Sequence, residues 1–272
     1  MLYKELKTIL ENEIAPKRYK ESLEFSGVQY GDINGGTLIK RVLITIDLNL
    51  NVLHFAIKNK ITFVISQLPL LEKPIFKINK SLINKLNLLS RYPLCIYVLN
   101  SSYIASENGV SEIISKMLYL NIDDVLEVRD SKGKKNTIGR ICIPMKYPNQ
   151  GDSFLLKDLL KRVKSHFNLQ IVSYVGEIKQ EITKICVIPT ENHGDKFINK
   201  AVKNNCNTLI TSNIDYKQAV IAKEAGISLI SIPYHKTSYY SLKKLYNYLS
   251  LQFPNDKFIF FDEKSPINYF IP

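Results

Sequence analysis

Short apolar runs alternate with amphipathic helical segments along most of this chain, and this alternation constrains the fold more than any other feature. Residues 61–66 form a continuous apolar run, typical of a parallel strand buried on both faces. Val110, Ile113 and Met117 recur at helical spacing. The alternation predicts an α/β fold with mostly parallel sheets covered by helices on both faces. The expected strands are 41–47, 61–66, 94–99, 125–129, 138–143, 171–175, 184–188, 208–211, 228–232 and 258–261, and the expected helices are 2–13, 49–57, 81–90, 110–118, 155–167, 196–204, 216–225 and 241–251.

The pattern divides into two α/β halves that join near residues 122–152, where the alternation is least regular. We expect residues 1–122 to form the first half and residues 123–272 the second. Packing of the C-terminal helix and strand back onto the first half stays open, because strand order cannot be read from the sequence.

Composition excludes several classes of protein. The chain has 272 residues and no apolar run long enough to cross a membrane, and its first residues mix acids with lysines, unlike a signal peptide. We therefore expect a cytoplasmic protein. The formal net charge is +12, but the lysines are scattered and no nucleic-acid-binding motif is present. This predicts a solvated basic surface, with any nucleic-acid binding non-specific.

The four cysteines are far apart in the sequence, with no CxxC pair and no histidine at ligand spacing. Three of them, Cys95, Cys142 and Cys186, lie inside apolar runs. Because free cysteine is among the most buried residue types, we expect buried thiols rather than a disulfide or a zinc site.

Several segments, taken in order, resemble the NIF-three-like family, whose members are also called dinuclear metal centre hexameric proteins or GTP cyclohydrolase type-two homologues. The likeness spans nearly the whole chain, and the order of the segments carries it more than any one motif. The matching segments are SGVQYG (26–31), LITID (43–47), ISQLP (65–69), PLCIYVLNSS (93–102), NGVS (108–111), IGR (138–140), LITSNIDYKQA (209–219), AKEAG (222–226) and SIPYHKTS (231–238).

In that family, two adjacent histidines after the second strand, an aspartate after the third, and a C-terminal histidine and glutamate bind two divalent metal ions. The resemblance places these positions at Gln67, Leu68, Ile104, Tyr234 and Ser238, and places His235 on a family tyrosine. Catalytic metal sites are built from imidazole, thiolate or carboxylate ligands, and none of the five side chains belongs to these classes. We therefore expect no family-type metal site, no cofactor and no catalytic residue.

The resemblance and the missing ligands together predict a non-catalytic binding or regulatory scaffold with a degenerate metal site. Family members assemble as hexamers, so the resemblance implies a homo-oligomer, while the identity of a small-molecule or protein ligand stays open. The predicted pocket residues are neutral groups at the family's ligand positions or beside them: Gln67, Asn100, Ser101, Tyr234, His235, Thr237 and Ser238.

Two other functions compete with this one. The chain could be a metal-dependent hydrolase of nucleotide-like or phosphate substrates with relocated ligands, for which Glu191, His193 and Asp195 are candidates. The same segment also fits a solvated loop in which Asp195 caps the following helix. The third possibility is a basic protein associated with nucleic acid.

Overall fold

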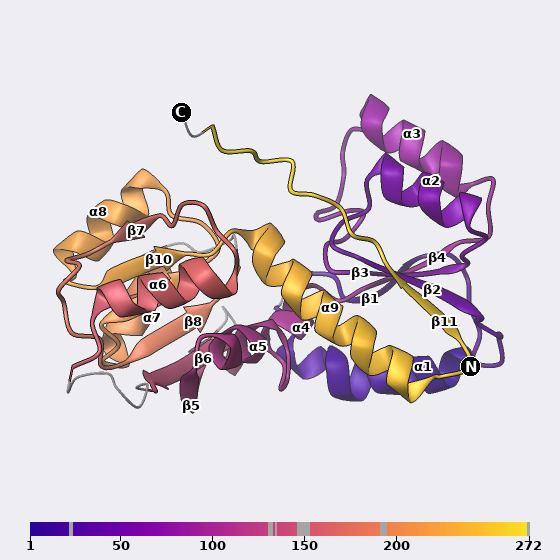
Figure 1. The fold of residues 1–272 in the computed structure, drawn as a ribbon. Coiled ribbons are helices and arrows are strands. Elements are labelled where there is room, and N and C mark those ends of the chain that lie inside the picture. Colours follow the sequence, from indigo (N-terminus) through magenta and orange to yellow (C-terminus); the bar gives the residue numbers. More distant parts are fainter. Residues whose placement is uncertain (22–23, 130–132, 134, 146–152, 191–194, 271–272) are drawn as a thin grey trace. The chain divides into compact units, whose positions relative to one another are not determined.

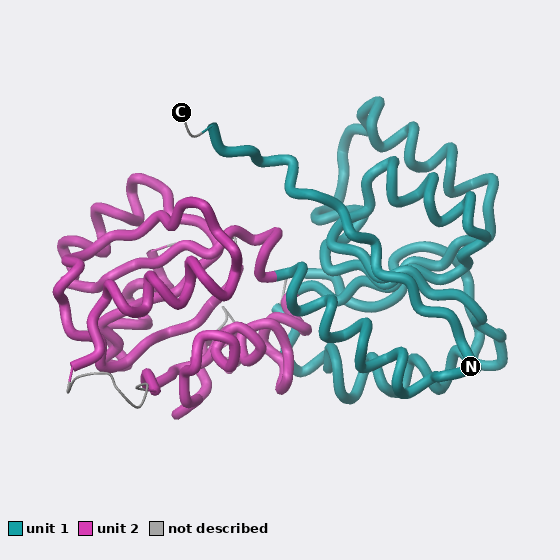
Figure 2. Tube along the Cα trace, viewed as in Figure 1, with its two compact units in different colours: residues 1–100, 238–272 teal, residues 101–237 magenta. Residues whose placement is uncertain are grey.

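The structure is a computed structural model that describes residues 1–272 except 22–23, 130–132, 134, 146–152, 191–194 and 271–272 (Figure 1). The chain divides into two compact units (Figure 2). Unit 1 comprises residues 1–100 and 238–272, and unit 2 comprises residues 101–237. Each unit has its own sheet and its own buried core, so the predicted α/β class with two halves is confirmed.

Unit 1 is built on a five-stranded sheet in the order β1-β4-β3-β2-β11. The apolar run predicted to be a buried strand is β3, whose four residues are all buried. Four strands of this sheet run parallel, and only β1 pairs antiparallel, with β4. The last strand of the chain, β11, pairs with β2 at the opposite edge. The strands are β1 (Gly27–Tyr30), β2 (Arg41–Thr45), β3 (Phe63–Ser66), β4 (Cys95–Val98) and β11 (Lys257–Phe260).

Helices lie on both faces of this sheet (Figure 1). On one face, Val52 and Leu53 of α2 pack in a cluster with Leu43 and Val64 of the sheet. Asn49 caps the start of α2, because its side-chain oxygen accepts a hydrogen bond from the Val52 N–H at 3.1 Å. The helical segments of this part are α1 (Tyr3–Ile9), η1 (Leu10–Ile14), η2 (Lys17–Tyr19), α2 (Leu50–Lys58), α3 (Lys80–Leu89) and α9 (Tyr234–Gln252), whose first four residues belong to unit 2.

Unit 2 contains a six-stranded sheet in the order β5-β6-β8-β9-β10-β7. The central strands β8, β9 and β10 run parallel, as expected from the strand–helix alternation. The outer pairings β5–β6, β6–β8 and β7–β10 are antiparallel, so this sheet is less parallel than the sequence indicates. The strands are β5 (Leu120–Arg129), β6 (Lys135–Pro144), β7 (Tyr174–Val175), β8 (Ile185–Ile188), β9 (Thr208–Thr211) and β10 (Ser228–Ser231).

Neighbouring residues of β6 show how helices cover both faces of this sheet. Ile141 and Cys142 are consecutive and therefore point to opposite faces. Ile141 packs in a cluster with Phe197 of α7, whereas the Cys142 thiol donates a hydrogen bond to Ser115 Oγ of α5 at 3.3 Å. The helices of unit 2 are α4 (Asn100–Ala105), whose first residue belongs to unit 1, α5 (Val110–Met117), α6 (Leu156–His166), α7 (Asp195–Lys203) and α8 (Tyr216–Glu224).

The compact units differ from the predicted halves at both ends of unit 2. Unit 2 begins at Ser101 rather than residue 123, because α5 packs against β5 and β6. The chain returns to unit 1 at Ser238, because β11 hydrogen-bonds with β2. The sequence left open where the C-terminal helix and strand pack. The structure places residues 238–272 in unit 1, with the first part of the chain.

In the part of the chain that the structure describes, we find no helix with both the length and the apolar character needed to cross a membrane.

Candidate functional site

In α/β sheets, ligands bind beyond the carboxyl ends of the parallel strands, where the loops to the following helices begin. Each unit has such an edge, and the predicted pocket residues divide between the two units. Gln67, Asn100 and Ser238 belong to unit 1, whereas Ser101, Tyr234, His235 and Thr237 belong to unit 2.

Gln67 follows β3 directly, and its side chain is 1% exposed. Its backbone N–H donates to the Thr45 carbonyl at the end of β2 (3.1 Å), which fixes the residue at the sheet edge. Its amide Nε2 donates to the Asn100 carbonyl at 3.1 Å. Only the amide nitrogen can face that carbonyl, so Oε1 points elsewhere, and it is buried with no hydrogen-bond partner among the described residues. Gln67 therefore has a buried acceptor, Oε1, that is free to accept a hydrogen bond.

Asn100 completes this pair from the end of β4. Its backbone N–H donates to the Gln67 carbonyl at 3.0 Å, so the two residues exchange hydrogen bonds. It adopts a left-handed backbone conformation with φ of 49°, which asparagine tolerates better than most residues. Its side-chain amide donates to the Phe25 carbonyl at 3.1 Å. The structure thus brings together two of the predicted pocket residues, Gln67 and Asn100.

The loop after Gln67 is held by Gln29, whose role sequence reasoning missed. Gln29 Oε1 accepts hydrogen bonds from the backbone N–H groups of Leu70 (2.7 Å) and Leu71 (3.2 Å), and Nε2 donates to the Leu71 carbonyl (2.8 Å). Both ends of this amide are therefore satisfied. The one sign of its importance in the sequence was its place in the SGVQYG segment. Its partners could not be predicted, because they lie about 40 positions further along the chain.

The predicted residues at the start of α9 lie in its first turns rather than in a loop. Thr237 is fully buried, and its hydroxyl donates to the Tyr234 carbonyl at 2.9 Å. Ser238 is also buried, and Tyr234 and His235 are partly exposed. Helix α9 begins at Tyr234 instead of residue 241. The first turns of α9 were not predicted from the sequence, because the segment YHKTSYY is poor in strong helix formers.

Three of the positions that the resemblance assigns to family ligands illustrate why they do not suit divalent metal ions. Leu68 is partly exposed and Ile104 is buried in α4, and neither side chain has an atom that can coordinate a metal. Gln67 presents a neutral amide oxygen. Among the described residues, no three His, Cys, Asp or Glu side chains gather in a way that could hold a metal ion. These residues therefore do not fit a dinuclear centre of the family type.

The candidates for relocated ligands are placed only in part. Glu191 and His193 lie outside the described residues. Asp195 begins α7, where its Oδ2 forms an ion pair with Lys217 Nζ at 2.8 Å.

Two carboxylates at the edge of unit 1 were not singled out as site residues. Asp47 follows β2, and burial raises the pKa of its carboxyl, an effect to which nearby Glu263 adds. Glu263 comes from the segment after β11 and accepts a hydrogen bond from Asn49 Nδ2 at 2.6 Å. In the sequence, Asp47 stood out only as the last residue of the segment LITID, and the approach of Glu263 depends on the β2–β11 pairing.

The family assignment comes from whole-chain comparison. A family model described as Duf34/NIF3 (NGG1p interacting factor 3) matches residues 1–266. The chain belongs to the Duf34/NIF3 family. This confirms the resemblance that the order of the matching sequence segments indicated.

Two relatives and one solved structure are similar to this chain over most of its length. The Clostridium acetobutylicum protein named GTP cyclohydrolase 1 type 2 homolog is 23% identical over 241 residues, covering 88% of this chain and 86% of that protein. A protein of the same name from Methanocaldococcus jannaschii is 23% identical over 250 residues, covering 92% and 95%. A hypothetical protein of Staphylococcus aureus has a similar fold, with a TM-score of 0.81, 21% identity and 99% coverage of both chains.

A pair of glutamine variants tests the open acceptor of Gln67. Gln29→Leu should lower the free energy of unfolding by about 1–3 kcal/mol, because the backbone groups of Leu70 and Leu71 lose their hydrogen-bond partner. Gln67→Leu should change it by less than about 1 kcal/mol, because the lost bond to Asn100 is offset by removal of an unsatisfied buried oxygen. Urea unfolding of both variants measures the difference. Equal losses would show that Gln67 Oε1 is satisfied in solution.

Proposed function

We propose that this member of the Duf34/NIF3 family is a non-catalytic binding or regulatory scaffold whose dinuclear metal site is degenerate. The observation that carries the proposal is Gln67, a buried neutral amide at a family ligand position, with one acceptor left open. A buried acceptor without a partner costs free energy. A ligand that donates a hydrogen bond at this edge would remove that cost, whereas a metal ion would gain only one weak, neutral ligand.

Electrostatics supports the loss of the metals. Two divalent ions about 4 Å apart repel by about 17 kcal/mol at an effective dielectric constant of about 20. Anionic ligands normally offset such repulsion, but none of the five corresponding positions carries an acidic side chain. The net charge of +12 does not offset the repulsion between the two cations either. A family-type hydrolase would therefore need a new set of anionic ligands.

The proposal includes a homo-oligomer, by resemblance a hexamer, located in the cytoplasm. Three exposed apolar side chains that are close in sequence near the C-terminal end support association, since clusters of such groups commonly mark interaction sites. Ile267, Tyr269 and Phe270 are 65%, 51% and 92% exposed.

Metal analysis tests the degenerate site directly. The full chain, purified without a His tag or chelator and dialysed against Mn²⁺ and Zn²⁺, should contain close to no bound metal per chain. Its melting temperature should not rise with either ion in a manner that EDTA reverses, because metal that does not bind the native state cannot stabilise it. The measurements are elemental analysis and thermal unfolding with and without EDTA.

Two results would contradict this proposal. About two divalent ions per chain would restore a dinuclear centre and reopen hydrolysis. An EDTA-reversible rise in melting temperature that disappears in a Glu191→Gln/His193→Gln double variant would locate relocated ligands in that segment.

A further inference from the structure

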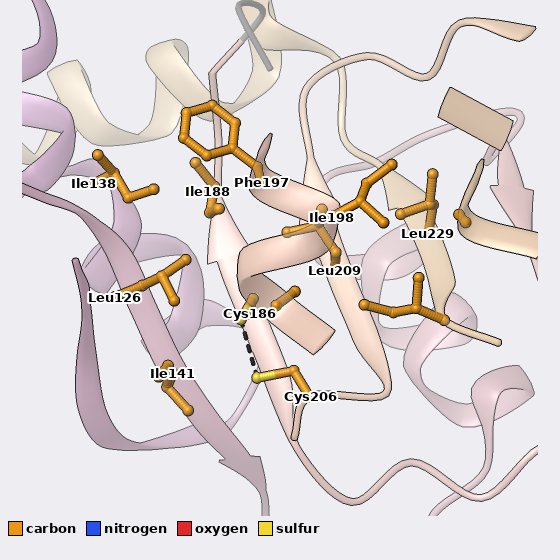
Figure 3. Packing of buried hydrophobic residues seen from close by; sticks show 13 residues of the cluster. Leu126, Ile138, Ile141, Cys186, Ile188, Phe197, Ile198, Cys206, Leu209 and Leu229 are labelled. Carbon is orange, nitrogen blue, oxygen red and sulfur yellow. Dashed lines mark hydrogen bonds between the residues drawn. The ribbon is translucent and has the colours of Figure 1, made fainter. Parts of the chain in front are cut away.

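Two thiols face each other in the core of unit 2 (Figure 3). Cys186 lies on β8, and Cys206 lies in the turn between α7 and β9. Their sulfur atoms are 3.0 Å apart, and both side chains are buried. They belong to an apolar cluster that includes Ile141 of β6 and Leu209 of β9.

The backbone on each side holds this pair in place. Cys186 is opposite Ile141 of β6 and Leu209 of β9, so its strand is fixed along both edges. Cys206 donates its N–H to the Ala201 carbonyl at the end of α7 (3.0 Å). The next residue, Asn207, donates its N–H to the Lys184 carbonyl (3.0 Å). The meeting of the sulfur atoms therefore follows from regular hydrogen bonding of the two segments.

The separation of the sulfur atoms and their surroundings favour a covalent bond over a metal site. Zinc–sulfur bonds of about 2.3 Å in tetrahedral geometry would place two thiolates about 3.8 Å apart. The sulfur atoms here are closer than that, and the described neighbours in the cluster are apolar. A disulfide needs a sulfur–sulfur distance of about 2.05 Å, which a movement of about 1 Å would supply. We propose that Cys186 and Cys206 form an intramolecular disulfide when the protein meets a small peroxide.

The reaction requires only the two thiols and hydrogen peroxide. The Cys206 thiolate attacks one peroxide oxygen, the O–O bond breaks, and the departing hydroxide takes up a proton, leaving Cys206 as a sulfenic acid. Cys186 loses its proton and attacks the sulfenic sulfur, the S–O bond breaks, and a second water leaves. The two sulfurs are oxidised and the peroxide is reduced to two waters.

The hydrogen bond within the pair assigns the two roles. The Cys186 thiol donates to Cys206, and this bond lowers the pKa of the Cys206 thiol against the opposing effect of burial. The same bond, together with burial, raises the pKa of Cys186. Cys206 also has the greater exposure, 5% against 0%. Cys206 is therefore the attacking thiol and Cys186 the resolving thiol.

Cys142 and Cys95 provide internal controls. The Cys142 thiol points to the other face of the sheet, toward Ser115, and burial raises its pKa to about 11. Cys95 is buried in unit 1, and burial raises its pKa to about 12. Neither should form the bond.

The experiment exposes the full chain to hydrogen peroxide, alkylates it in denaturant, and maps its peptides by mass spectrometry without reduction. The expected product has lost two of its four thiols. Before alkylation it is lighter than the reduced chain by about 2 Da, and it shows a Cys186–Cys206 linkage and returns to four thiols with dithiothreitol. Cys206→Ala and Cys186→Ala should each abolish the linkage, whereas Cys95→Ala and Cys142→Ala should retain it.

Several results would overturn the proposal. These are four thiols that persist after treatment, oxygen adducts without a linkage, or a linkage through Cys142 or between two chains. Because the peptide map of the unmodified sequence decides between them, the test does not depend on whether a cysteine variant folds.

Discussion

Replacing Arg140 with methionine is expected to lower the free energy of unfolding by about 3–5 kcal/mol, the usual cost of breaking a buried ion pair. Arg140 is 1% exposed, and its Nε donates to Glu112 Oε1 at 3.0 Å. Nη2 donates to the Ser106 carbonyl (2.9 Å) and Nη1 to the Gly139 carbonyl (3.0 Å). Methionine keeps much of the volume but leaves a poorly solvated carboxylate and two carbonyls without these donors.

Urea unfolding of Arg140→Met measures this loss, with Arg41→Met as the control. Arg41 is exposed, and among the described residues its side chain makes one hydrogen bond, to the Asn59 carbonyl at 2.7 Å, so its replacement should cost less than about 1 kcal/mol. Adding Glu112→Gln to Arg140→Met should recover part of the loss, because it removes a largely buried carboxylate whose cationic partner is then the half-exposed Lys116, at 3.2 Å. Similar losses for the two arginine variants would contradict a structural role for Arg140.

The ion pair of Arg140 and Glu112 should also affect how the free energy of unfolding depends on pH in acid. Burial raises the pKa of Glu112, but hydrogen bonds from the Asn108 N–H and from Arg140 outweigh burial and leave it below its usual 4.5. A carboxyl whose pKa is lower in the folded state stabilises the protein above its unfolded pKa and loses this contribution as pH falls. Stability should therefore decline below about pH 4.5, and less steeply in Arg140→Met.

The order of strands and helices could be predicted from the sequence because it depends on local periodicity. The apolar run at β3 and the cap at Asn49 are each contained within a few residues. The pairing of β11 with β2 joins residues about 200 positions apart, and nothing local encodes it. The return of the chain to unit 1 at Ser238 follows from that pairing.

The chemistry of the candidate site was predictable to a lesser extent. Gln67 was identified through the resemblance to the family, and the structure adds that its amide nitrogen is hydrogen-bonded while its amide oxygen has no partner among the described residues. Arg140 was visible only as part of the segment IGR, since arginine is rarely buried and its partner Glu112 lies 28 residues earlier. The contact between Cys186 and Cys206 was likewise hidden, because their separation of 20 residues matches no motif.

The second large effect is expected at Gly109, where alanine should lower the free energy of unfolding by about 3 kcal/mol, at the upper end of overpacking costs. Gly109 begins α5 with an ordinary φ of −80°, so the reason is space rather than backbone conformation. A Cβ atom there would lie inside 3.0 Å of the Tyr103 carbonyl and 2.9 Å from the Ser106 carbonyl. Both are backbone atoms of the preceding turn, which cannot move aside as the end of a flexible side chain can.

Gly36→Ala is the matched control for this substitution. Its added Cβ would meet only Asn34 Oδ1, at an ordinary 3.5 Å, in an exposed turn. Alanine there should raise the free energy of unfolding by up to about 1 kcal/mol, because it restricts the unfolded chain without straining the folded one. The two substitutions add the same methyl group, so opposite shifts of the urea midpoint would isolate the close packing before α5. An unchanged midpoint for Gly109→Ala would mean that the turn can yield, and that the close approach of Tyr103 and Ser106 does not hold α5 in place.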